Sequence, residues 1–352
     1  MIMFIILLFS ITIIYPFFTR KSVLADGEKI RYNNKYYIFI VSFVLIFILG
    51  LRGRNVGIDT KVYYDIYNSV KEFSLSNFFV QDIEYGYYLL QYLIKSIFGE
   101  FQILLLIVAI FYISVVSYHI YKYSSNPLFS YILFIIYGFF SFAMSATRQT
   151  IAIAFVMIAY EHIKQKKLFK FLIFVFIAMS FHISAVIFLP AYWFNKFKLN
   201  RKNILIFFMI GLVMIGFRGP IQIIMNNYSR IKYAPVETGG NIMYVFMLIS
   251  VLIGVIYRKI LIDRSINNTY LFYMMISALL IMPLTQFHPA VMRLYFYFFI
   301  FLVIYIPNML SSIKDIIIRY VGIGAYLAIG IIWFFTSTIS IEKLETYMFF
   351  WQ

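Results

Sequence analysis

Residues 101–121 read FQILLLIVAIFYISVVSYHIY and contain no Lys, Arg, Asp or Glu. In an α-helix, which rises about 1.5 Å per residue, such a run covers roughly 30 Å, the thickness of the hydrocarbon core of a bilayer. Lipid offers the backbone no hydrogen-bond partners, and a helix pairs its own groups internally. This stretch therefore predicts a membrane-spanning helix.

Comparable apolar runs recur along the whole chain. Hydrophobic residues make up 63% of the sequence and charged residues 12%, whereas soluble domains carry about 25% charged residues. The expected spans are residues 2–18, 36–51, 101–121, 127–143, 149–163, 168–181, 183–195, 203–217, 241–257, 268–287, 290–310 and 316–338. We predict an all-α, polytopic integral membrane protein of GT-C-like architecture, with about 11–12 transmembrane or broken helices.

Residues 51–98 interrupt the series of apolar runs. Towards their end, Glu84, Gln91 and Lys95 fall on one helical face, while Leu and Ile cover much of the remainder. This pattern is typical of an interfacial amphipathic helix rather than of a crossing. We expect an external loop and an amphipathic helix here, within a single transmembrane domain that covers residues 1–352.

Lys and Arg indicate which side each loop faces, because cytoplasmic loops carry an excess of them. They concentrate at residues 20–35, 164–170 and 196–202. All three segments are cytoplasmic if residues 168–195 form a broken hairpin that crosses twice, whereas one long helix there would move the third to the other side. Loops that face anionic lipid then explain the net charge of +16, so we expect no nucleic-acid partner.

The ionisable residues left on the external side are candidates for a functional site. They are Arg52, Arg54, Asp59, Asp82, Glu84, Arg148, His182, Arg230, His288 and Arg293. Each has an ordinary explanation by itself: Arg148 could reach lipid headgroups, His182 could bond to a backbone carbonyl, and Asp59 could cap a helix. Their placement together on the side where Arg is normally depleted favours a functional site.

These residue types suit a lipid substrate that carries a diphosphate. Guanidinium groups bind phosphate through paired hydrogen bonds and stay charged when partly desolvated. They also offset the charge of a departing diphosphate, and His or a carboxylate can act as general base for a sugar hydroxyl. The chain has no cysteine, which excludes disulfides, thiolate catalysis and Cys-based metal sites.

Several short motifs follow one another along most of the chain. They are LRGRNVGIDT at 51–60 with Tyr63 after it, EYGY at 84–87, SATRQTIA at 145–152, FHISA at 181–185, and Arg293 with Tyr295-Phe296. Together they resemble the EpsG family of exopolysaccharide and O-antigen polymerases, often called Wzy-type. The resemblance implies transfer of a growing glycan from an undecaprenyl-diphosphate carrier to another carrier-linked repeat, at the external face of the bacterial inner membrane.

The resemblance and the residue chemistry together predict a polymerase that needs no metal and no other cofactor. His182 would be the general base, with Asp59 or Glu84 as substitutes, and Gly57 and Gly86 would let the backbone turn closely around the substrate. The diphosphate would be held by Arg52, Arg54, Arg148 and Arg293, and the other substrate contacts made by Tyr63, Tyr87, Gln149 and His288. A chain-length regulator and a flippase would be partners.

Three alternatives stay open. A metal-dependent GT-C glycosyltransferase could bind its ion through Asp59, Asp82 and Glu84. An O-antigen ligase would use the same donor chemistry and transfer the glycan to a different acceptor. A flippase or transporter of the lipid-linked oligosaccharide would need mid-span charges or internal repeats, for which the sequence shows no convincing signal.

Overall fold

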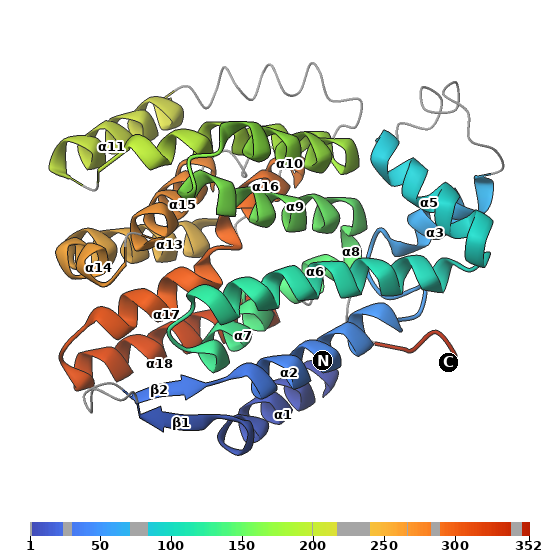
Figure 1. Ribbon diagram of the computed structural model, residues 1–352, viewed down its shortest axis with the longest axis horizontal. Helices are drawn as coiled ribbons and strands as arrows, with labels where there is room; N and C mark the ends of the chain where they lie inside the picture. Colours follow the sequence, from blue (N-terminus) through green and yellow to red (C-terminus); the bar gives the residue numbers. More distant parts are fainter. Residues whose placement is uncertain are drawn as a thin grey trace. The chain divides into compact units, whose positions relative to one another are not determined.

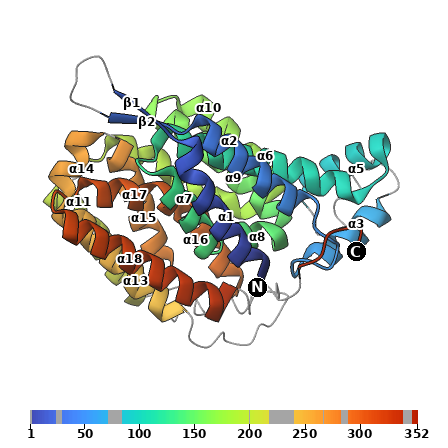
Figure 2. The ribbon, with the colours of Figure 1, turned by 90° about the horizontal axis from the view of Figure 1, so that it is seen from below.

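Helices account for almost all of the described chain (Figure 1). The computed structural model describes residues 2–23, 30–70, 84–198, 200–216, 240–265, 267–282, 289–338 and 347–352. The predicted all-α class is confirmed. One small hairpin was not expected: β1 (Arg20–Val23) pairs antiparallel with β2 (Ile30–Asn33), so that Arg20 lies opposite Asn33 (Figure 2).

The chain divides into two compact units. The first comprises Met1–Ile158, Phe176–Ile183 and Ala325–Gln352, and the second comprises Ala159–Val175 and Ser184–Gly324. Besides the hairpin, the first unit holds α1 (Ile2–Phe18), α2 (Lys35–Gly50), α3 (Thr60–Ser69), α5 (Tyr85–Phe98), α6 (Phe101–Tyr123), α7 (Pro127–Ile136), α8 (Phe139–Ser145), the first part of α9 (Thr147–Lys164) and η3 (Phe334–Thr338).

The second unit holds most of the remaining helices. They are the end of α9, the start of α10 (Leu168–Phe181), η1 (Ile183–Lys196), α11 (Arg201–Gly216), α13 (Gly240–Ile256), α14 (Arg258–Arg264), α15 (Asn267–Ile281), α16 (Pro289–Phe299), α17 (Leu302–Ser312) and the first half of α18 (Ile316–Trp333). Within the described residues, each expected span coincides with one of the helices named here or with a consecutive pair of them, and residues 217 and 283–287 of two expected spans lie outside the described residues.

Two described helices are long and apolar enough to cross a membrane alone, Phe101–Tyr123 and Ile316–Thr336. Up to four spans result if the bent pairs α7–α8 and α16–α17 each count as one. The pairs bend by 49° and 43°, so the segments expected at 127–143 and 290–310 are broken helices, which the predicted mixture of transmembrane and broken helices includes. Gly138 explains the first break, because it stands between α7 and α8 in a left-handed conformation with a φ of 84°.

Residues 168–195 form a broken hairpin rather than one long helix. The α-helix α10 ends at Phe181, and the 3₁₀-helix η1 begins at Ile183. Near the start of α10, the Phe171 ring lies 6.0 Å from the Phe188 ring and 5.3 Å from the Tyr192 ring of η1. The chain therefore turns back on itself at His182, which is the arrangement that the Lys and Arg counts required.

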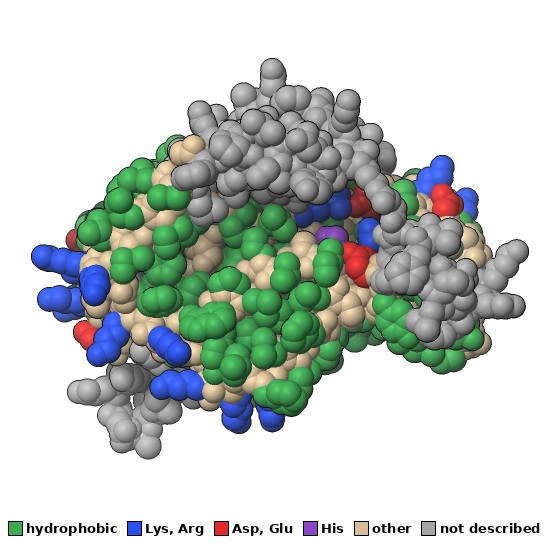
Figure 3. All heavy atoms as spheres, turned by 90° about the horizontal axis from the view of Figure 1, so that it is seen from above, with side chains coloured by type: hydrophobic (Ala, Val, Ile, Leu, Met, Phe, Trp, Pro, Cys, Tyr) green, Lys and Arg blue, Asp and Glu red, His purple; other side chains and the backbone are tan. Residues whose placement is uncertain are grey.

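Large apolar side chains are exposed on helices of both units. The exposed fractions of Phe17, Phe39, Phe169 and Ile317 all exceed 70%, and Figure 3 shows hydrophobic side chains over much of the visible surface. Monomeric soluble proteins seldom expose apolar area on this scale. The outward-facing apolar helices are those of a multi-pass membrane protein.

The predicted amphipathic helix is confirmed as α5, but its polar face points inward. Gln91 is buried, whereas the apolar Ile97 and Phe98 are exposed. Lys95 donates three hydrogen bonds from Nζ to carbonyl oxygens at the end of α3: those of Tyr67 (2.9 Å), Asn68 (2.7 Å) and Val70 (2.7 Å). This lysine satisfies carbonyls that a helix end leaves unpaired, and it fixes α3 against α5.

Lys95→Met should lower the free energy of unfolding by about 2 kcal/mol, because hydrogen bonds to a charged group are lost and carbonyls are left unpaired. Thermal unfolding in detergent measures the change. Lys61→Met is the matched control, since Lys61 is an exposed residue of α3. Equal stability of the two variants would show that the lysine cap contributes nothing.

Candidate functional site

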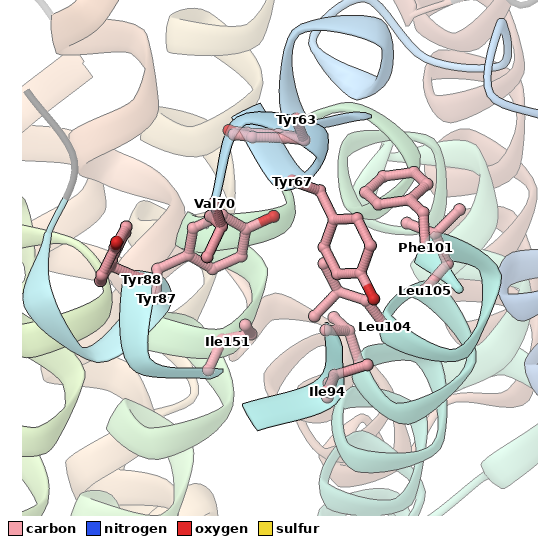
Figure 4. Close-up of a cluster of buried hydrophobic side chains, with 11 residues drawn as sticks. Tyr63, Tyr67, Val70, Tyr87, Tyr88, Ile94, Phe101, Leu104, Leu105 and Ile151 are labelled. Atoms are coloured by element: carbon pink, nitrogen blue, oxygen red, sulfur yellow. The ribbon is translucent and has the colours of Figure 1, made fainter. Parts of the chain in front are cut away.

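Aromatic side chains hold α3 and α5 on α6 and α9 in the first unit (Figure 4). The Phe101 ring of α6 lies 5.5 Å from the Tyr67 ring, and the Tyr63 and Tyr87 rings meet edge to face at 5.6 Å. Tyr87 is fully buried. Because this cluster is well packed, the residues at the start of α5 and α9 have defined positions.

Glu84 is the N-cap residue of α5, yet its side chain does not cap the helix. Its Oε1 accepts a hydrogen bond from Nδ1 of His182 at 2.7 Å and one from the backbone N–H of Ile183 at 3.4 Å. Its Oε2 is paired with Nη1 of Arg148. The Glu84 carboxylate therefore contacts both an arginine and a histidine. The three residues come from three separate sequence motifs.

Arg148 lies in the first turn of α9, with its guanidinium 5.6 Å from the centroid of the Tyr63 ring. Its Nε is buried and has no hydrogen-bond partner among the described residues. The side chains of Arg148, His182 and Glu84 are 24%, 20% and 16% exposed. The three groups are thus largely desolvated but can still be reached by a ligand, a setting that strengthens their electrostatic interactions.

The two partners of Glu84 control its ionisation. Burial by itself would raise its pKa, but the hydrogen bond from His182 and the positive charge of Arg148 outweigh burial and lower the pKa to about 2. Glu84 therefore stays ionised throughout the physiological pH range. A carboxylate with so low a pKa orients and charges its neighbours well but is a weak general base.

The lowered pKa predicts a pH-dependent stability. Ionised Glu84 stabilises the folded state above its ordinary pKa of 4.5, and this contribution is lost as the pH falls from about 4.5 towards 2. The difference in Tm between the wild type and Glu84→Gln should therefore be largest above pH 5 and shrink on acidification. Thermal unfolding at pH 7 and pH 3 measures it, and an unchanged difference would contradict the ion pairing.

Gly57 holds the loop before α3 against the end of α8. Its φ is 94°, and a Cβ added to it would lie 2.3 Å from the Met144 carbonyl oxygen. The Ile58 N–H donates to Ser145 Oγ (3.0 Å), and the Thr60 hydroxyl donates to the Met144 carbonyl (2.8 Å). Since α8 leads directly into α9, this loop supports the residue positions around Arg148.

Gly57→Ala should destabilise the protein more than Gly99→Ala, by about 2 kcal/mol or more. Both glycines have a positive φ, which costs an alanine about 1–2 kcal/mol, but a Cβ on Gly99 would meet nothing within 4 Å. The comparison isolates the overlap with Met144, and unfolding in detergent measures it. Equal losses of stability in the two variants would mean that the loop before α3 moves away from Met144 at no cost in free energy.

Gly86 allows α5 to approach the end of α10. A Cβ added to Gly86 would lie 2.8 Å from the Ser180 carbonyl oxygen, so this close contact brings Glu84 next to His182. Gly57 and Gly86 were expected to let the backbone turn closely around the substrate. In the structure each allows a close approach to the protein's own backbone, at Met144 and at Ser180, and the contact with substrate stays a prediction.

The other predicted site residues lie in different settings. Tyr63 and Tyr87 belong to the cluster around Arg148, and Gln149 is buried in the same turn of α9. Asp59 is the N-cap residue of α3, without a side-chain capping bond. Arg293 belongs to the second unit, on α16. The predicted site residues Asp82, Arg230 and His288 lie outside the described residues.

Arg52 is buried rather than open to a ligand. It is 2% exposed, and its Nη1 donates to the Leu49 carbonyl. Burial lowers its pKa to about 10, although Tyr347 and Tyr87 act in the opposite direction. Arg54 is exposed and lies over the Tyr64 ring, at 5.3 Å from its centroid, on another face of α3 from Arg148.

A segment far along the chain covers Arg52, and sequence reasoning missed it. Residues 347–352 read YMFFWQ, and the isolated β-bridge between Arg52 and Phe349 holds this segment beside the loop after α2. Figure 2 shows the C-terminus near α3. The high aromatic content of residues 347–352 is the feature of the sequence that could have drawn attention to this segment. Composition does not, however, indicate where a segment packs.

No group of three His, Asp or Glu side chains within the described ranges has the spacing of a metal site. Asp82, which the metal-dependent alternative needs, lies outside those ranges. Both oxygens of Glu84 already have partners, His182 and Arg148.

The helices and the cluster together define a multi-pass membrane protein with a partly buried arginine, carboxylate and histidine at neighbouring helix ends. The model of the EpsG family matches residues 35–352, so the chain belongs to the EpsG family, a family of Wzy-type polysaccharide polymerases. No curated protein and no solved structure is similar enough to the chain to count as a match.

Proposed function

We propose that this polymerase transfers a glycan from an undecaprenyl-diphosphate carrier to the sugar hydroxyl of another carrier-linked repeat unit, at the external face of the bacterial cytoplasmic membrane. The observation that carries the proposal is the Glu84 carboxylate, which joins Arg148 to His182. Family membership supports polysaccharide polymerisation in general. The cluster adds a cation and a base within one partly exposed site.

His182 acts as the general base. Ionised Glu84 accepts the N–H of Nδ1 at 2.7 Å, and this fixes the tautomer in which Nε2 carries a lone pair. Nε2 takes the proton of the acceptor hydroxyl while its oxygen bonds to the anomeric carbon of the donor sugar. The low pKa of Glu84 favours His182 over Glu84 for this step, and Glu84 serves as a positioning residue.

Arg148 stabilises the leaving group. As the bond between the anomeric carbon and the phosphate oxygen breaks, the diphosphate leaves on its lipid with the bonding electron pair. Nη1 of Arg148 is paired with Glu84, whereas Nε has no partner among the described residues. The N–H groups of Arg148 that are not paired with Glu84 can bind an anionic diphosphate and offset the negative charge that develops on the diphosphate as it leaves. Arg293, on α16 of the second unit, stays a candidate for diphosphate binding on the chemistry of its guanidinium alone.

The distribution of charge along two consecutive helices supports the external location. Arg148 stands at the start of α9, whose other end carries Lys164, and His182 follows the end of α10, which begins next to Lys167. A cytoplasmic position for these lysines, as expected from their excess on that side, leaves the cluster at the opposite end of both helices.

Deletion of the gene in its host tests the function and separates the alternatives. A polymerase predicts loss of polymer and accumulation of single carrier-linked repeat units that periplasmic or external enzymes can reach. A flippase predicts the same units on the cytoplasmic side, and a ligase predicts long carrier-linked polymer that is not transferred. Unchanged polymer length and amount would overturn the proposal.

A further inference from the structure

A polar recess lies in the first unit, apart from the Glu84 cluster. It has a volume of about 570 Å³ and is lined by the loop after α2, one face of α3, the turn between α5 and α6, and the segment Met348–Gln352. Such a volume is in the range of small-molecule sites. The roles argued for His182 and Arg148 do not use this recess, which we call the α3 cleft.

Amide side chains and aromatic rings line the α3 cleft. The Tyr64 hydroxyl is hydrogen bonded to the side chains of Asn68 and Arg54, and the Arg54 guanidinium lies over the Tyr64 ring. Phe350, on the other wall, is 50% exposed. Amides can pair with neighbouring hydroxyls, and flat rings can stack on the apolar face of a sugar.

The charges in the α3 cleft argue against a diphosphate. Arg54 shares the lining with Glu100, whose carboxylate would repel a multiply charged anion. A polyhydroxylated and largely neutral ligand meets no such repulsion, and both charged groups can hydrogen bond to it. Arg54 is therefore better placed to contact sugars than the carrier diphosphate.

Backbone pairing gives the α3 cleft a defined shape. The Gly53 N–H donates to the Met348 carbonyl (2.8 Å), and the Phe350 N–H donates to the Leu51 carbonyl (3.0 Å). A Cβ on Gly53 would lie 3.3 Å from carbonyl oxygens of this segment, so glycine permits the close approach. A wall held in this way is already in place before a ligand binds, which reduces the entropic cost of binding.

We propose that the α3 cleft is a glycan-binding subsite, which holds sugar residues of the growing polymer while its end reacts at the Glu84 cluster. This inference rests on the proposed function. Helix α3 links the two places: Tyr63 contacts Arg148, while Tyr64, about 100° further round the helix, faces the α3 cleft. A glycan that runs along α3 can therefore contact the α3 cleft and the Glu84 cluster at the same time.

The test uses the purified full-length protein in nanodiscs and polymer fragments of two or three repeat units, released by partial hydrolysis and free of lipid and phosphate. Saturation-transfer NMR and calorimetry measure their binding. Asn68→Ala and Phe350→Ala should each weaken binding about tenfold, as expected for the loss of one hydrogen bond or stacking contact, and shorten the polymer. Ser69→Ala and Phe350→Tyr are the matched controls and should behave like the wild type.

Wild-type binding and polymer length in both Asn68→Ala and Phe350→Ala would overturn the subsite, as would a polymerising wild type that binds no fragment. An equal loss in Ser69→Ala would also overturn it, because that residue does not line the α3 cleft. If the wild type binds fragments through Asn68 and Phe350 but forms no polymer, the proposed function fails while the subsite stands. Gel filtration shows whether each variant is folded. Asn68 and Phe350 lie on separate walls of the α3 cleft, so their two variants test the subsite independently.

Discussion

Arg148→Gln should lower the rate of polymer formation by about 100- to 1,000-fold, the usual cost of removing a group that stabilises charge in a transition state. Glutamine retains hydrogen-bonding capacity but loses the positive charge that faces Glu84 and, in our proposal, the departing diphosphate. Arg148→Lys should retain part of the activity, because it keeps the charge but not the planar fork of donors.

The measurement is the initial rate of chain extension at equal amounts of folded protein. Arg201→Gln is the matched control, since Arg201 is an exposed arginine at the start of α11. Its rate should equal that of the wild type. If Arg148→Gln and Arg201→Gln had the same rate, Arg148 would have no part in the chemistry.

His182→Ala should reduce kcat by about 100- to 10,000-fold and change KM little, because a general base acts mainly in the transition state. The substitution also removes the Nδ1 hydrogen bond to Glu84, but it leaves the Arg148 pair intact. The remaining activity should rise at alkaline pH, where the acceptor hydroxyl needs less help to lose its proton.

His162→Gln provides the comparison for this substitution. His162 lies near the other end of α9 and stacks on Phe174, with ring centroids 5.3 Å apart. Steady-state kinetics with carrier-linked repeat units should give this variant the kcat of the wild type. A His182→Ala enzyme with wild-type kcat would remove His182 from the mechanism and leave Asp59 as the next candidate base.

The positions of the helices could be predicted because lipid leaves the chain few choices. An apolar run such as 101–121 has to form a helix in a membrane, and α6 covers Phe101–Tyr123. The bend at Gly138 and the hairpin β1–β2 depend on local backbone geometry, which hydropathy does not report. The turn at His182 was left open because two short runs fit one long helix as well as a hairpin.

The members of the candidate site could be predicted from residue chemistry, but their pairing could not. Glu84 is 64 residues from Arg148 and 98 residues from His182, and the sequence does not state that one carboxylate contacts both. Arg52 and Arg54 looked equivalent in LRGRNVGIDT. They differ because the segment Tyr347–Gln352 packs on Arg52 and leaves Arg54 exposed in the α3 cleft.

The central claim is that this protein, without a partner protein, joins carrier-linked repeat units at its Glu84–Arg148–His182 cluster. It is tested most directly by reconstituting the purified protein in liposomes with undecaprenyl-diphosphate-linked repeat units and following the products by gel electrophoresis. We predict a ladder of polymer lengths from the wild type, with or without a metal chelator, and single units from Arg148→Gln and His182→Ala. Equal ladders from the wild type and both variants would contradict the claim.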